Sequence, residues 1–120
     1  MTTDMELAEI YDAAADYLEV HGHCTGTLVD ETGAVCASGA ICAVIDPELL
    51  VCKPFASVDE EGRFTKDGQR WYDAIQGLKL PITLSGRRMS LTRWNDDVAE
   101  DSFEVIDLFR NAAKGLRNNA

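Results

Sequence analysis

The chain has few prolines, no long apolar run and almost no positive charge in its first half. Only 3 of its 120 residues are proline and 46% are hydrophobic, which is typical of a globular domain rather than of a disordered or collagen-like chain. No stretch approaches the roughly 20 consecutive apolar residues that a membrane-spanning helix needs. We therefore expect one folded domain over residues 1–120, with no membrane among its partners.

Basic residues are scarce in the first half. Residues 1–60 hold 12 acidic side chains and one basic one, Lys53, and the formal net charge of the whole chain is −10. Proteins that contact a nucleic-acid backbone use Lys and Arg, so we expect no direct nucleic-acid binding. An acidic surface fits either docking on a basic partner or simple solubility, and the sequence leaves both open.

A secretory signal is also missing. The N-terminus, Met1 to Asp4, lacks the basic and then apolar character of a signal peptide. This predicts a cytoplasmic protein, in which cysteines stay reduced. The cysteines form no Cys-x2-Cys pair of the kind that structural zinc sites use; they are Cys24, Cys36, Cys42 and Cys52. We expect buried thiols with no metal and no cofactor, and keep a small metal-binding module as an alternative.

The first helix is predicted to begin at Asp4, because Thr3 and Glu6 form a capping-box pattern. One face of this helix is apolar, with Leu7, Ile10, Tyr11, Ala14 and Leu18 at helical spacing. The opposite face carries only carboxylates, which we call the acidic stripe: Glu9, Asp12, Asp16 and Glu19. Like charges four residues apart repel each other in a helix. We therefore predict the acidic stripe as a protein-binding surface, with solubility alone as the alternative.

Three further helices follow from the apolar pattern. The uncharged segment Val35–Ile45 predicts a buried helix after a turn at Asp30–Gly33, and Thr65–Lys79 predicts another. Asp101 can cap a last helix that carries Val105, Phe109, Ala112 and Leu116. The result is a mainly α fold of about four helices around one core.

Residues 82–91 alternate between apolar and polar around a Ser-Gly turn, which predicts a small hairpin packed on the helices. This short β-hairpin or irregular β element leaves an α+β fold open. Arg87 and Arg88, with Arg93 nearby, are expected to be solvated or to pair with the acidic half of the chain.

Several blocks together resemble a known family. They are Gly22–Thr27, Asp30–Gly33, the Cys-Ala-x-Gly-Ala block of Val35–Ile41, the Trp-Asn-Asp block of Leu91–Asp96, and the helix Phe103–Lys114. In this combination the chain is similar to a family of short proteins of unknown function from actinobacteria and their phages. One position departs from the pattern, because His23 stands where that family tends to have an aromatic residue. The resemblance implies a phage-related protein that occupies the surface of a host protein.

The Trp-Asn-Asp block has two interpretations. Trp94 suits a core position, while Asn95 and Asp96 can bond local backbone amides at the start of the last helix. Alternatively, these side chains and Cys36 line the mouth of a pocket. A sharper hypothesis is a cysteine-dependent hydrolase or acyltransferase, in which Cys36 at a helix N-terminus is activated by His23 and by Asn95 or Asp96.

We expect a non-enzymatic accessory or regulatory protein that binds another protein, and assign no catalytic residue. The hydrolase or acyltransferase that uses Cys36 and the metal-binding module stay as alternatives. The sequence leaves open the partner, the oligomeric state and whether the cysteines share a site.

Overall fold

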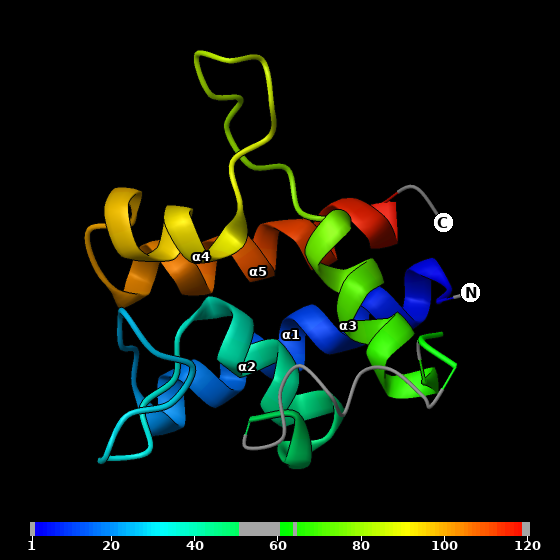
Figure 1. Ribbon diagram of the computed structural model, residues 1–120, viewed down its shortest axis with the longest axis horizontal. Helices are drawn as coiled ribbons and strands as arrows, with labels where there is room; N and C mark the ends of the chain where they lie inside the picture. Colours follow the sequence, from blue (N-terminus) through cyan, green and yellow to red (C-terminus); the bar gives the residue numbers. More distant parts are fainter. Residues whose placement is uncertain (1, 51–60, 64, 119–120) are drawn as a thin grey trace.

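The computed structural model describes residues 2–50, 61–63 and 65–118, and Cys52 lies outside them (Figure 1). The described residues form α1 (Asp4–His21), α2 (Ala37–Ile45), α3 (Lys66–Gln76), α4 (Leu91–Arg93) and α5 (Ser102–Asn118). Two shorter turns accompany them, the 3-10 helix η1 (Pro47–Leu50) and the π-helical turn η3 (Trp94–Val98). The predicted mainly α fold is confirmed. None of these helices is both long and apolar enough to cross a membrane.

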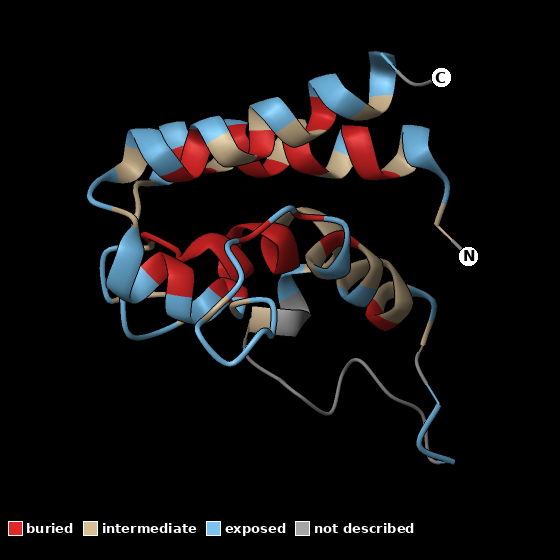
Figure 2. Ribbon diagram, turned by 90° about the horizontal axis from the view of Figure 1, so that it is seen from above, coloured by how far each residue is buried: buried red, intermediate tan, exposed pale blue. Residues whose placement is uncertain are grey.

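The helices form two layers. In Figure 2, α1 and α5 run antiparallel as one layer, and their buried residues face a second layer that contains α2 and α3. The core side chains of α1 are Leu7, Ala8, Tyr11, Ala14, Ala15 and Leu18, and those of α5 are Val105, Ile106, Phe109 and Ala113. At the centre, the rings of Tyr11 and Phe109 stack with their centroids 6.1 Å apart. Both long helices therefore bury one face, as their apolar spacing predicts.

The predicted helix starts are confirmed at both ends of the chain. The hydroxyl oxygen of Thr3 accepts a hydrogen bond from the backbone N–H of Glu6 at 3.2 Å. The Asp101 carboxylate accepts one from the N–H of Glu104 at 3.0 Å. These bonds satisfy backbone donors that the first turn of a helix leaves without an intrahelical partner.

The second helix begins later than predicted. It starts at Ala37, and Cys36 is its N-cap, because the Cys36 sulfur accepts a hydrogen bond from the N–H of Gly39 at 3.3 Å. Val35 is instead held outside the helix by isolated bridges to His23 and Val29. The backbone before α2 is thus extended, and α2 follows it directly into the core.

A hydrogen bond between the two layers joins α3 to α1. The phenol of Tyr11, fully buried, donates a hydrogen bond to the carbonyl oxygen of Ala74 at 2.6 Å. α3 ends at Gln76 rather than at the predicted Lys79. A side chain on Gly77 would lie against the Tyr11 hydroxyl, with its Cβ only 2.5 Å from that oxygen. A residue without a side chain is therefore required where the chain leaves α3.

The segment predicted as a short β-hairpin or irregular β element forms an irregular β element, but its outer part does not pack on the helices as expected. Residues 81–90, which we call the projecting loop, contain one isolated bridge, between Ile82 and Arg88, and extend away from the helices (Figure 1). Ile82 is 73% exposed and Leu84 is fully exposed. Ile82 and Leu84 therefore face solvent, whereas Met89 at the base of the loop packs against the core.

Candidate functional site

The first candidate site is built around Asn95, which is fully buried in η3. Its Oδ1 accepts hydrogen bonds from the backbone N–H of Ala37 at 2.9 Å and from Nε2 of His23 at 2.7 Å. Its Nδ2 donates to the carbonyl oxygen of Cys24 at 3.2 Å and to the Asp96 carboxylate at 2.9 Å. Both polar atoms of the amide are fully used. Since Oδ1 only accepts, Nε2 of His23 carries the proton in this contact.

Asp96 extends this cluster. Its Oδ1 also accepts a hydrogen bond from the backbone N–H of Gly26 at 3.0 Å. The hydrogen bond from Asn95, then that from Gly26, and the charge of His23 lower the pKa of the Asp96 carboxyl, although partial burial opposes them. The carboxylate is thus held in its charged form, which suits an acceptor in a structural role.

The Asn-Asp pair therefore works over a longer range than predicted. Asn95 and Asp96 do bond backbone groups, but those groups lie on the distant 24–37 segment and not at the start of α5. Trp94 packs in the core, as expected. The cluster joins η3 to the start of α2 and to the extended segment before it.

The thiols near this cluster are not activated. Cys36 is 4% exposed, and burial raises the pKa of its thiol despite the hydrogen bond from Gly39. Burial first, and then the nearby Cys36 and two carboxylates, raise the pKa of Cys24 to about 11. A cysteine nucleophile needs a lowered pKa. The structure brings His23 to Asn95. The raised pKa of Cys36 keeps its thiol protonated at neutral pH, and Asn95 bonds backbone groups as a structural amide.

A metal centre finds no support in the described part of the chain. Among those residues, no group of three or more His, Cys, Asp or Glu side chains is placed to hold a metal ion.

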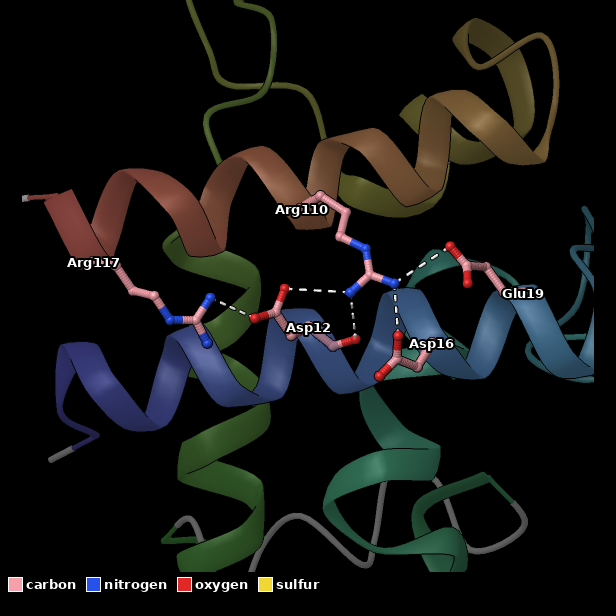
Figure 3. A network of polar contacts seen from close by, with 5 residues as sticks. All are labelled: Asp12, Asp16, Glu19, Arg110 and Arg117. Carbon is pink, nitrogen blue, oxygen red and sulfur yellow. Dashed lines mark hydrogen bonds and ion pairs between the residues drawn. The ribbon is translucent and has the colours of Figure 1, made fainter.

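The second candidate site is the acidic stripe, of which Asp12, Asp16 and Glu19 lie against α5 (Figure 3). Nη2 of Arg110 is 2.6 Å from the Asp16 carboxylate and 3.3 Å from that of Glu19. Nη1 of the same guanidinium is 3.4 Å from Asp12, which also pairs with Arg117 at 2.5 Å. Three of the four predicted binding carboxylates are therefore engaged within the chain.

Glu9, the fourth carboxylate of the acidic stripe, is exposed, and the ion pairs between described residues do not include it. Arg110 and Arg117 were not predicted from the sequence as the partners of the other three carboxylates. The spacing of the two arginines could have indicated this pairing. Arg110 and Arg117 are seven residues apart and so lie on one face of a helix, and Asp12 and Glu19 have the same spacing. Of the two expectations for Arg87, Arg88 and Arg93, solvation or pairing with the acidic half, the described residues show all three arginines exposed, and Arg93 pairs with Asp97 at 3.9 Å.

Among the residues that the structure describes, two surface clefts stand out. One, of about 280 Å³, lies between α1, α2 and α3 and is lined by Glu6, Glu9, Ile10, Ala13, Val44, Ile45 and Arg70. The other, of about 370 Å³, lies at the base of the projecting loop, with Trp71, Leu80 and Met89 among its lining residues. Cys36, Trp94, Asn95 and Asp96, predicted as a possible pocket, line neither of them.

The fold and these sites define a small helical domain with a structural polar cluster and an exposed apolar loop. Residues 2–115 match DUF6197, a family of unknown function, and the chain belongs to that family. No curated protein and no solved structure matches the chain.

Proposed function

We propose that this protein is a non-enzymatic accessory or regulatory protein that binds another protein, and that the projecting loop is its binding element. The observation that carries the proposal is the exposure of Leu84 and Ile82 on the projecting loop. Neighbouring exposed apolar side chains at one prominent place on a small domain are typical of interaction sites. The sequence favours a protein partner, because a strongly acidic chain is a poor match for nucleic acid.

Hydrogen bonds within the projecting loop support this function. The N–H of Thr83 donates to the carbonyl of Arg87 at 2.7 Å, and the N–H of Gly86 donates to that of Thr83 at 2.9 Å. The Thr83 hydroxyl adds a further bond to the Arg87 carbonyl at 3.0 Å. A loop that is already held in one conformation loses less entropy when it binds. Ile82 and Leu84 are thus presented to a partner at low conformational cost.

The residues of the loop also favour a partner of particular chemistry. Arg88 anchors the base, because its Nη1 donates to the carbonyl of Gln76 at 2.7 Å. Arg87 is exposed beside the apolar residues. An apolar end flanked by a cation fits an apolar pocket with an acidic rim, since complementary rim charges favour the correct encounter.

The loop is a better binding candidate than the acidic stripe. Arg110 and Arg117 already occupy Asp12, Asp16 and Glu19, so a partner would have to displace them. A cysteine-dependent hydrolase is disfavoured by the raised pKa values of Cys24 and Cys36. A phage or actinobacterial source and a cytoplasmic location stay predictions from the sequence.

The test compares three immobilised forms of the full chain in lysate from the source cells. They are the wild type, Leu84→Asp, and Val20→Asp as a matched control, because Val20 is also an exposed apolar residue, 77% exposed, but lies on α1. We expect specific proteins to be captured by the wild type and by Val20→Asp and lost with Leu84→Asp. The same captured proteins with all three forms would contradict the proposal.

A further inference from the structure

We infer that the projecting loop binds a second copy of this chain, with Leu84 of one copy seated in the cleft between α1, α2 and α3 of the next. This inference rests on the proposed function, because it uses the same loop as the binding element. The cleft is lined by apolar side chains and by two carboxylates, Glu6 and Glu9, with Arg70 beside Glu6.

The floor of the cleft can accept the loop. It is formed by Ile10 and Ala13 of α1 with Val44 and Ile45 of α2, and the cleft has a volume of about 280 Å³. Seating Leu84 on these side chains would remove the most exposed apolar residue of the loop from water.

The charges at the rim match those of the loop. Glu6 and Glu9 line the cleft, and Glu6 has a neighbouring cation of its own, since Arg70 is 3.9 Å from its carboxylate. The ion pairs between described residues leave Glu9 out, and it is exposed. Arg87 is the exposed cation beside Leu84. Arg87 of one copy and Glu9 of the other form a complementary pair around the apolar contact.

The arrangement of the fold makes this contact intermolecular. In Figure 1 the projecting loop extends from the upper side of the domain, whereas the C-terminal end of α2, which lines the cleft, lies on the lower side. The loop of one copy therefore meets the cleft of another. Because the loop and the cleft lie on opposite sides of the domain, two copies cannot exchange both contacts at once, so the contact builds a head-to-tail ring or chain instead of a two-fold dimer.

The test measures the mass of the 120-residue chain in solution by sedimentation over a wide range of concentration. We expect the wild type to self-associate, and expect Leu84→Asp, Arg87→Glu and Glu9→Arg each to weaken association at least tenfold. The last two place like charges at the rim, which opposes docking. Val20→Asp is the matched control and keeps the wild-type association.

Two experiments that restore self-association test the loop and the cleft separately. The double variant Arg87→Glu with Glu9→Arg restores association, because the two charges are exchanged. An equimolar mixture of Leu84→Asp, whose cleft is intact, with Glu9→Arg, whose loop is intact, forms one-to-one heterodimers that neither variant forms alone. Failure of both restorations would overturn the loop-to-cleft contact, even if the single variants lose association.

The outcomes distinguish this inference from the proposed function. A wild-type chain that stays monomeric at every concentration overturns self-association, while Leu84-dependent capture of another protein would leave the proposed function intact. Association that persists in Leu84→Asp also overturns the inference. The proposed function is contradicted as well only if the wild-type chain neither self-associates nor captures another protein through Leu84.

Discussion

The guanidinium of Arg110 on α5 lies 2.6 Å from the carboxylate of Asp16 on α1, and the same group reaches Asp12 and Glu19 (Figure 3). One arginine thus neutralises the part of the acidic stripe where like charges would otherwise repel. The stripe therefore contributes to the packing of α1 against α5. Its partner is found within the chain.

Replacing Arg110 with alanine is expected to lower the free energy of unfolding by about 1 kcal/mol, because the pairs are partly exposed. Chemical denaturation measures this loss. The difference from the wild type should shrink as salt is added, since ions screen the carboxylates that the variant leaves together.

Lys114→Ala provides the control for Arg110→Ala, because Lys114 is an exposed cation on the same helix. It should change stability by less than about 0.5 kcal/mol. Equal effects of the two substitutions would show that the network of Figure 3 adds nothing beyond net charge.

Replacing Asn95 with alanine is expected to cost about 2–3 kcal/mol, because it leaves the N–H of Ala37 and the carbonyl of Cys24 without their buried partner. Thermal and denaturant unfolding report the loss. Asn111→Ala, an exposed position on α5, is the matched control. Similar stabilities for the two variants would contradict the structural role of Asn95.

The thiol of Cys24 gives a prediction for alkaline pH. Its pKa is raised from 9.0 to about 11 in the folded chain, so the unfolded chain loses this proton first as the pH rises. Between pH 9 and about 11 the folded state holds more protons, and its stability therefore falls as the pH increases. Comparison of the wild type with Cys24→Ser over this window measures the contribution.

The same pKa shifts predict slow alkylation of Cys24 and Cys36 by iodoacetamide at pH 7, since the reactive species is the thiolate. Peptide mapping by mass spectrometry follows each cysteine separately. Rapid modification of Cys36 at pH 6 would instead support the hydrolase or acyltransferase hypothesis.

Two glycine substitutions should have opposite effects. Gly39→Ala is expected to destabilise the domain by at least about 1 kcal/mol, because the new Cβ would collide with the carbonyl oxygen of Leu28. Gly115→Ala meets no atom within 4 Å in α5 and should stabilise by about 0.5–1 kcal/mol. Equal effects in denaturant titrations would contradict the close approach of Leu28 to α2.

The sequence predicts the fold where local chemistry decides it. Thr3 and Asp101 cap the first and last helices as expected, because the side chain and the N–H that it accepts are three residues apart. The start of α2 is different. Cys36 caps it through a sulfur atom, and the pairing of Val35 with His23 and Val29 depends on contacts that no short pattern contains.

The candidate sites depend on contacts between distant segments. Asn95 bonds the N–H of Ala37, 58 residues away, so its role could not be derived from its own neighbours. Ile82 and Leu84 alternate as strand residues do, but alternation does not say which face finds a core. Only the placement of the projecting loop away from the helices shows that they are exposed.

Site-specific photo-crosslinking tests most directly whether the projecting loop contacts a protein partner. A photoreactive benzophenone amino acid replaces Leu84 in one sample and Val20 in another, and both are irradiated in lysate from the source cells. We expect discrete adducts, with another protein or a second copy of this chain, from position 84 and none from position 20. No adduct from position 84, or the same adducts from both positions, would contradict such a contact.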